Sequence, residues 1–338
     1  MINKQIDLRS DTLTKPCEDM RRSMASAEVG DDVFGEDPTV NILEQSLAER
    51  AGHEAGLFFP SGTQSNLVAL LAHCQRGDEY IVGQNAHTYR YEAGGAAVLG
   101  SIQPQPLEHD EDGTIPLEKI RASIKEDDFH FARTKVLALE NTIGGKIIPP
   151  SYIQSAKTVA HDAGLIFHLD GARVFNAAVG QGLELDQITR DFDSVSICLS
   201  KGLGAPIGSV LVGSKDTIEE ALRWRKMVGG GMRQAGILAA AGLYALENNV
   251  QRLAQDHANA QRLAEQLLGI EGLEVRGGSA HTNMVYLSSG DRGQELLDWC
   301  EQRDVLFTGS DTARLVLHKD VSAAMVETAA EVIQSFFK

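Results

Sequence analysis

The chain alternates between short apolar runs and stretches of helical character, and this alternation constrains the fold more than any other feature. The clearest apolar runs span residues 57–59, 136–139, 165–169 and 195–199. They are apolar on successive residues, which is typical of strands buried on both faces. Strands of this kind, separated by helices such as the one predicted from Asn66 onward, indicate an α/β fold with a mostly parallel sheet.

The character of the sequence changes after Gly231. Residues that follow are rich in Ala and Leu at first and then alternate between strand-like and helical patterns. The predicted elements are long helices over 235–268, strands over 283–287 and 314–317, and a closing helix over 322–337. We therefore predict an N-terminal arm and large domain over residues 1–245, and a smaller α+β C-terminal domain over residues 246–338.

Charge and composition argue against several classes of function. Lys and Arg number 31 against 47 Asp and Glu, which gives a formal net charge of −16. We expect no nucleic-acid or anionic-membrane partner, because phosphate-rich surfaces select basic proteins. No apolar run approaches the ~20 residues of a membrane-spanning helix, and the first residues lack the pattern of a signal peptide. A cytoplasmic location is the expectation.

The four cysteines do not suggest a disulfide or metal framework. Cys17, Cys74, Cys198 and Cys300 are far apart in the sequence and form no paired motif. Neither a set of disulfides nor a structural zinc site is expected from such spacing. We predict that the protein uses no metal.

Three of the predicted strands end in a reactive polar residue: Glu140, Asp170 and Lys201. Ligands of open α/β sheets bind beyond the carboxyl ends of the strands, so Asp170 is expected to face a crevice. A partly desolvated lysine has a lowered pKa and can form an imine with an aldehyde. The alternatives are that Asp170 caps the next helix and that Lys201 lies on the surface in a glycine-rich turn. About one strand–helix–strand step separates the two residues, which places them on nearby strand ends.

Two segments could bind a phosphate. Residues 61–66, Ser-Gly-Thr-Gln-Ser-Asn, join a strand to a helix start, where backbone N–H groups, hydroxyls and the helix dipole attract anions. Residues 229–233, Gly-Gly-Gly-Met-Arg, combine a flexible backbone with a guanidinium. The alternatives are an ordinary helix cap and a flexible turn. A phosphate cradle, an Asp for a pyridinium nitrogen and a Lys for a Schiff base are together what pyridoxal phosphate (PLP) requires.

The sequence resembles the L-threonine aldolase family of fold-type I PLP enzymes, in particular its low-specificity L-threonine and L-allo-threonine members. The resemblance covers nearly the whole chain. The motifs that carry it are DLRSDT at 7–12, GDDVFGEDP at 30–38, PSGT at 60–63, HFART at 130–134, LENT at 139–142, HLDGAR at 168–173, CLSKGL at 198–203 and GGGMRQAG at 229–236. It implies a large PLP-binding domain with a smaller C-terminal domain, usually assembled as a homotetramer. The implied reaction is retro-aldol cleavage of a β-hydroxy-α-amino acid into glycine and an aldehyde, acetaldehyde in the case of threonine.

The resemblance also implies which residues hold the cofactor. Lys201 matches the Schiff-base lysine, and Asp170 matches the partner of the pyridine nitrogen. His87 would lie against the cofactor ring, while Gly62 and Thr63 would hold the phosphate. In this family the residue at Arg233 is expected to reach the phosphate of a cofactor bound in a neighbouring subunit, so that active sites are shared between subunits.

A second group of residues is implied to bind the amino-acid substrate. Ser10, Arg173 and Arg314 match positions that bind its carboxylate, with Arg173 also near the ring hydroxyl of the cofactor. His130 matches a histidine that approaches the β-hydroxyl group. The base that accepts the β-hydroxyl proton is left open between His87 and His130, acting directly or through a water, because an imidazole titrates near neutral pH.

Two departures from the family pattern and two alternative functions remain. Phe34 stands where many relatives carry Tyr, and residues 141–145 lack a His that often follows Thr142. Both differences could alter substrate preference. The alternatives to an aldolase are another fold-type I PLP lyase or aminotransferase, in which Lys201 would move a Cα proton, and a PLP-binding regulator without turnover.

Overall fold

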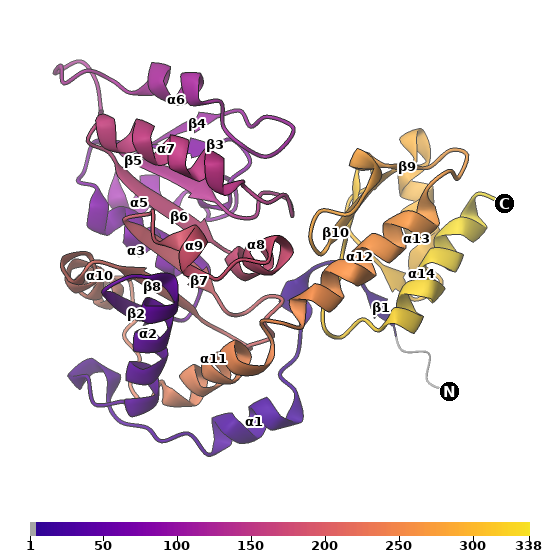
Figure 1. The fold of residues 1–338 in the computed structure, drawn as a ribbon, viewed down its shortest axis with the longest axis horizontal. Coiled ribbons are helices and arrows are strands. Elements are labelled where there is room, and N and C mark those ends of the chain that lie inside the picture. Colours follow the sequence, from indigo (N-terminus) through magenta and orange to yellow (C-terminus); the bar gives the residue numbers. More distant parts are fainter. Residues whose placement is uncertain (1–4) are drawn as a thin grey trace.

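A computed structural model describes residues 5–338, which form a large and a small lobe (Figure 1). A seven-stranded sheet in the order β2-β8-β7-β6-β5-β3-β4 runs through the large lobe. Of these strands, β8 runs antiparallel to its neighbours and the others share one direction. The predicted mostly parallel α/β fold is confirmed. The strands are β2 (Ala55–Phe59), β3 (Asp78–Gly83), β4 (Gln103–Leu107), β5 (Arg133–Glu140), β6 (Ile166–Gly171), β7 (Ser194–Cys198) and β8 (Ser209–Gly213).

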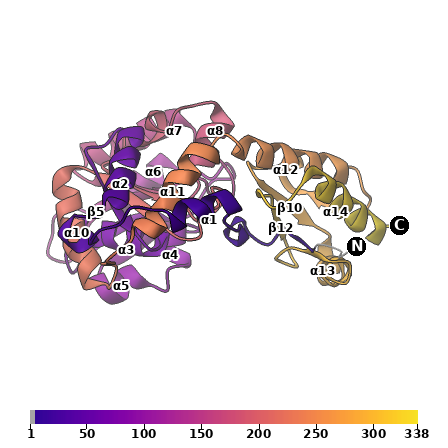
Figure 2. The same cartoon turned by 90° about the horizontal axis from the view of Figure 1, so that it is seen from below.

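Helices cover both faces of this sheet, which explains why its strands are apolar on successive residues. Phe58 and Phe59 show the principle, because consecutive side chains of a strand point to opposite faces. Phe58 packs in the main apolar core, whereas Phe59 packs in a second cluster with residues of α3 and α10. In Figure 2, α7 and α8 lie on one side of the large lobe and α4 and α5 on the other. The helices of this lobe are α1 (Glu18–Ala25), α2 (Pro38–Ala51), α3 (Gly62–His73), α4 (His87–Arg90), α5 (Gly95–Gly100), α6 (Leu117–Ser123), α7 (Pro150–Asp162), α8 (Val174–Gln181), α9 (Asp186–Thr189), α10 (Lys215–Met227) and α11 (Gly236–Asn248).

The small lobe combines a three-stranded antiparallel sheet with three helices. Its sheet consists of β9 (Glu274–Val275), β10 (Met284–Ser288) and β12 (Ala313–Val316), and its helices are α12 (Leu253–Leu267), α13 (Gly293–Glu301) and α14 (Ala323–Phe336). Short 3₁₀ turns occur at Asp11–Leu13, Asp32–Phe34, Arg276–Gly278 and Gly290–Arg292.

The N-terminal arm joins the core of the small lobe. β1 (Ile6–Asp7) pairs in parallel with β11 (Val305–Leu306), and the buried side chains of Ile6 and Leu8 belong to the apolar cluster of the C-terminal residues. The sequence grouped this arm with the large domain, whereas strand pairing attaches its first residues to the small lobe. The domain boundary near residue 245 stays a prediction.

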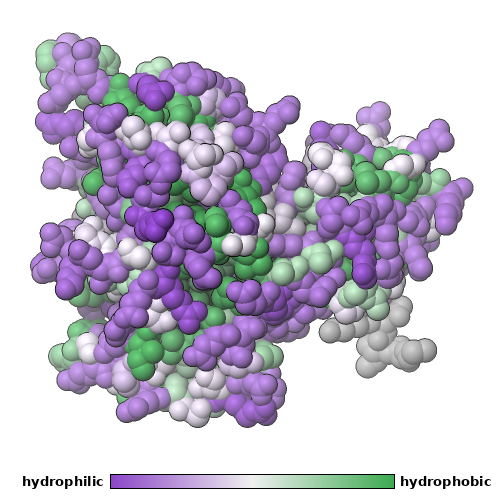
Figure 3. All heavy atoms as spheres, viewed as in Figure 1, coloured by the Kyte–Doolittle hydropathy of each residue, from purple (hydrophilic) through white to green (hydrophobic). Residues whose placement is uncertain are grey.

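The space-filling view shows a hydrophilic exterior with a notch between the two lobes (Figure 3). Apolar residues gather on the face of the large lobe beside that notch. Among residues 5–338, no helix has both the length and the apolar character needed to cross a membrane.

Candidate active site

The carboxyl ends of the central strands bring the predicted reactive residues to one edge of the sheet. Glu140, the last residue of β5, pairs in register with Asp170 near the end of β6. Asp170 pairs in turn with Ser196 of β7, and Lys201 follows that strand after three residues. The structure therefore brings Asp170 and Lys201 together on adjacent strand ends, as their spacing in the sequence predicted.

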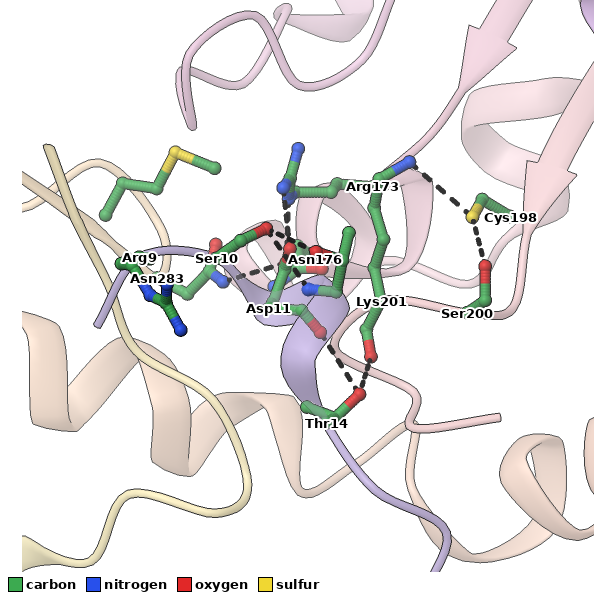
Figure 4. A network of polar contacts seen from close by, with 12 residues as sticks. Arg9, Ser10, Asp11, Thr14, Arg173, Asn176, Cys198, Ser200, Lys201 and Asn283 are labelled. Atoms are coloured by element: carbon green, nitrogen blue, oxygen red, sulfur yellow. Dashed lines mark hydrogen bonds and ion pairs between the residues drawn. The ribbon is translucent and has the colours of Figure 1, made fainter. Parts of the chain in front are cut away.

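The amine of Lys201 lies in a polar network that the N-terminal arm completes (Figure 4). Its Nζ is 3.5 Å from Cys198 Sγ, and its backbone carbonyl accepts a hydrogen bond of 2.9 Å from Thr14 Oγ1. Burial lowers the pKa of Lys201, but the charges of Cys198 and Asp170 outweigh burial and raise that pKa above its ordinary value. The expectation of a lowered pKa for Lys201 is thus wrong, because the sequence did not show that the negative charges near the amine outweigh its burial.

Asp170 is held by two donors on different elements. Its Oδ2 accepts a hydrogen bond of 2.9 Å from Asn66 Nδ2 on α3, and its Oδ1 accepts one of 3.0 Å from the backbone N–H of Ala172. The side chain is buried, with 4% of the residue exposed. Two hydrogen bonds in such a buried position fix the orientation of the carboxylate, which suits it to face a ring nitrogen.

His87 is the first residue of the short helix α4 and lies among buried carboxyl groups. Its backbone N–H donates to Glu140 Oε2 at 2.6 Å, and its Nδ1 lies at hydrogen-bonding distance, 2.8 Å, from Glu92 Oε1. The hydrogen bond to Glu92 raises the pKa of His87. Burial, together with the charge of Asp170, raises the pKa of Glu140 to about 8.

Glu92 and Asn66 are site residues that sequence reasoning missed. Asn66 lies in the segment 61–66 that was singled out for its glycine and hydroxyl groups, but its amide was given no role. One helical turn after Gly62, it reaches both Asp170 and Glu92. Glu92 follows His87 by five residues and carries no motif of its own. Helical spacing from Gly62 was the signal that could have identified Asn66.

The first turn of α3 offers the predicted phosphate cradle. Ser61 caps the helix, with its Oγ accepting a hydrogen bond from the N–H of Gln64, so the alternative reading of an N-cap is also correct. The amides of Gly62 and Thr63 lie at the positive end of a 12-residue helix. Ser209 Oγ is buried without a hydrogen-bond partner among the described residues, and it lies 3.4 Å from where a Cβ on Gly62 would be.

These observations test whether the chain fits PLP. A helix N-terminus and an unpartnered hydroxyl provide donors for a phosphate. A fixed carboxylate and a primary amine stand on neighbouring strand ends for the ring nitrogen and the aldehyde. The residues present therefore fit the cofactor, with Gly62 and Thr63 at its phosphate, Asp170 at its ring nitrogen and Lys201 at its aldehyde carbon.

Two arginines meet the N-terminal arm from opposite lobes. Arg173 donates from Nε and Nη2 to the buried carboxylate of Asp11, at 2.8 and 2.7 Å (Figure 4). Arg314, on β12, donates from Nη2 to the carbonyl of Arg9 at 3.1 Å, and its buried Nε has no partner among the described residues. Ser10 lies between these attachment points and caps the following 3₁₀ turn through its Oγ. Each arginine keeps guanidinium donors that the arm does not use, and such donors suit a carboxylate ligand.

The structure does not bring His130 to this site within one chain. It precedes β5, whereas Glu140 ends that strand, so the length of β5 separates them, roughly 23 Å for a strand of this size. His130 is exposed and lies 2.6 Å from Asp128 Oδ1. No role in the same subunit's site is compatible with this position.

Arg233 contacts Asp31 at the surface and none of the candidate site residues of its own chain described above. It forms an ion pair of 2.9 Å with Asp31, and 55% of its side chain is exposed. It follows the three glycines of the turn after α10, as the sequence indicated. Its guanidinium is thus accessible at the surface of the large lobe.

Comparison with known proteins assigns the family. The sequence model of beta-eliminating lyases matches residues 7–289. The low specificity L-threonine aldolase of Escherichia coli (strain K12) is 54% identical over 98% of this chain and 99% of its own length. The chain belongs to the threonine aldolase family. A probable low-specificity L-threonine aldolase of Arabidopsis thaliana is 45% identical over 99% of this chain and 98% of its own length.

Solved structures agree with this aldolase fold. A threonine aldolase of Leishmania major superposes with a TM-score of 0.83, at 20% identity, over 98% of this chain and all of the other. The present aldolase is accordingly a PLP-dependent lyase with the fold-type I architecture that the sequence predicted. Its substrates belong to the small amino acids.

The two departures from the family pattern take different positions in this aldolase. Phe34 is 73% exposed in the turn between α1 and α2, where it contributes an apolar ring to the surface. Thr142 is buried, and its Oγ1 has no hydrogen-bond partner among residues 5–338. The missing His would follow Thr142, where this chain has the buried Ile143. This departure comes three residues after Glu140, at the carboxyl end of β5, and so lies beside the candidate site.

Proposed function

We propose that this aldolase cleaves both L-threonine and L-allo-threonine to glycine and acetaldehyde. The single observation that supports it most is the edge of the sheet where Lys201, Asp170 and the start of α3 meet two arginines from opposite lobes. When bound there, PLP would supply an electron sink for breaking the Cα–Cβ bond. The remaining chemistry falls to the side chains of the chain.

Each residue has a proposed task. Lys201 holds the cofactor through its amine, and Asp170 keeps a proton on the ring nitrogen. Arg173, Arg314 and Ser10 bind the substrate carboxylate, which fixes the direction in which the β-carbon points. His87 accepts the β-hydroxyl proton at Nε2, because Nδ1 is already bonded to Glu92.

Product analysis with the two diastereomers side by side tests the function. We expect glycine and acetaldehyde in equal amounts from each substrate, and no keto acid. A keto acid as the product would support an aminotransferase instead. Tight PLP binding without turnover of either substrate would support a regulator. Equal reaction of both diastereomers would further show that the β-hydroxyl is recognised loosely.

We also propose a homotetramer in the cytoplasm, with active sites shared between subunits. Arg233 supports shared sites, since 55% of its side chain is exposed and its ion pair with Asp31 lies at the surface, where a phosphate could replace the carboxylate. A guanidinium on a flexible triple-glycine segment is well suited to bind the phosphate of a cofactor in the neighbouring subunit.

A subunit-mixing experiment tests the shared sites. Lys201→Ala and Arg233→Ala are each expected to be inactive, whereas co-expression should restore activity. With random pairing, about a quarter of the sites would contain both intact residues, one from each chain. Arg262→Ala serves as the matched control and should stay active alone, because Arg262 has a similar exposure of 53% and also pairs with a carboxylate. Mixed oligomers, verified by pull-down on two tags, that show no activity would contradict shared sites.

A further inference from the structure

Glu92 connects two residues that the proposed function places at the cofactor. Its Oε1 lies 2.8 Å from His87 Nδ1 and accepts a hydrogen bond of 3.0 Å from Asn66 Nδ2. Asn66 Nδ2 also donates to Asp170 Oδ2 at 2.9 Å. Because an amide nitrogen carries two hydrogens, Asn66 uses one for each carboxylate. The four side chains thus form one continuous hydrogen-bonded chain.

This hydrogen-bonded network is buried at Asp170, Asn66 and Glu92 and partly exposed at His87. Glu92, Asn66 and Asp170 are exposed by 7%, 2% and 4%, whereas 38% of the His87 side chain is exposed. The members come from separate elements, Asn66 from α3 and Asp170 from β6, so Asn66 anchors the Glu92 carboxyl to the rigid sheet. Buried hydrogen bonds of this kind are electrostatically stronger than those in water.

We propose that Glu92 is a positioning residue that fixes the tautomer and the orientation of the His87 ring, and this inference rests on the proposed function. A neutral imidazole has one N–H and one bare nitrogen. An ionised carboxylate can only accept a hydrogen bond, so Glu92 in that form places the proton on Nδ1 and leaves Nε2 bare. Carboxylates orient catalytic and metal-bound histidines in the same way. Glu92 therefore leaves His87 with a proton acceptor on the side away from the buried network.

The charges around the ring agree with this role. The groups facing His87 are the carboxyls of Glu92, Asp170 and Glu140, and the hydrogen bond with Glu92 is the main cause that raises the pKa of His87. Burial raises the pKa of Glu92 itself, and the hydrogen bond with His87 opposes that rise. An imidazole with a raised pKa is a stronger base once it has lost its proton.

The substitution Glu92→Gln removes the charge while keeping an oxygen that can accept from both donors. We expect it to lower the pKa of His87 by about one pH unit, since a neighbouring carboxylate favours the protonated ring. The measurement is NMR titration of the full-length protein with labelled imidazole, both with PLP and after its removal. The His87 signal is identified by its loss in His87→Asn. The pH profile of kcat should shift toward lower pH in parallel, with kcat reduced about tenfold and KM little changed.

Glu44→Gln is the control, because Glu44 is a half-buried carboxyl on α2 whose Oε1 also accepts a hydrogen bond, from the backbone N–H of Phe58 at 2.7 Å. Glu44→Gln should leave the titration of His87 unchanged. An unchanged His87 pKa in Glu92→Gln would overturn the proposal.

The tautomer is read without any substitution, from the nitrogen chemical shifts of His87 in the wild-type protein above its pKa. A protonated Nδ1 and a bare Nε2 support the proposal, and a proton on Nε2 overturns it. Both NMR measurements are independent of threonine cleavage. If the protein does not cleave threonine but the titration and the tautomer of His87 are as expected, the proposed function is wrong and the assignment of Glu92 stands.

Discussion

Replacing Lys201 by Ala is expected to lower the turnover of L-threonine by at least about four orders of magnitude, equivalent to about 5 kcal/mol of barrier. Lys201 provides a primary amine at the sheet edge, next to Asp170 on the adjacent strand end. No covalent attachment of the cofactor to the chain is possible once this amine is removed. The variant should fold, because Ala leaves the backbone carbonyl that accepts from Thr14 in place.

The same residue is identified chemically in the wild-type protein. The purified protein should be yellow, borohydride should bleach it, and peptide mapping should find the reduced pyridoxyl group on Lys201. Lys157→Ala is the control. Lys157 lies on α7 and pairs with Asp191 at 2.9 Å, so its replacement should leave turnover unchanged. A modified lysine elsewhere, or near-normal turnover in Lys201→Ala, would remove Lys201 from the proposed mechanism.

The sequence predicted the strands that contain a mainly apolar run. β5, β6 and β7 each contain a run of buried residues that stands out from its surroundings, so their position and the residues after them could be inferred. β4 could not, because its sequence Gln-Pro-Gln-Pro-Leu places two prolines in five residues. Proline is tolerated there because β4 is an edge strand, whose outer N–H groups need no partner in the sheet.

The site was predictable where chemistry depends on strand ends and not where it depends on contacts between distant segments. Asp170 and Lys201 follow buried strands, and that local pattern indicates a ligand site. Asp11, by contrast, acts through Arg173, which lies 162 residues later in the chain. The sequence around Asp11 does not indicate a contact with Arg173, and the sequence around Arg173 does not indicate one with Asp11. Pairings of this kind arise from tertiary folding alone.

The position of His130 illustrates a signal that was present but unused. His130 comes before the strand 136–139 and Glu140 comes after it. In a parallel sheet, residues before and after one strand lie at opposite edges, so strand direction already separates His130 from the site in its own chain. The resemblance to the family concealed this, because it gives a residue's role without saying which subunit provides it.

Asp170→Ala is expected to leave PLP bound and to lower turnover by about three orders of magnitude, or about 4 kcal/mol of barrier. In the proposed function the carboxylate of Asp170 would hold a proton on the ring nitrogen of PLP, and without that proton the ring would withdraw electrons poorly. The cofactor keeps its attachment to Lys201 and its phosphate contacts, so binding should change far less than turnover. The measurements are kcat for L-threonine and a titration of the apoprotein with PLP.

A loss of turnover after this substitution has to be separated from a loss of structure. Asn66 and the N–H of Ala172 both lose their acceptor, which costs about 1–3 kcal/mol of folding free energy if they stay unpaired. Asp78→Ala serves as a control for the lost folding free energy. The buried Asp78 begins β3, away from the carboxyl ends of the strands, and accepts a hydrogen bond of 2.7 Å from the N–H of Gln75. If thermal unfolding shows similar destabilisation in both variants but only Asp170→Ala loses turnover, the carboxylate acts on the cofactor. Equal turnover in the two variants would show that Asp170 contributes only to the fold.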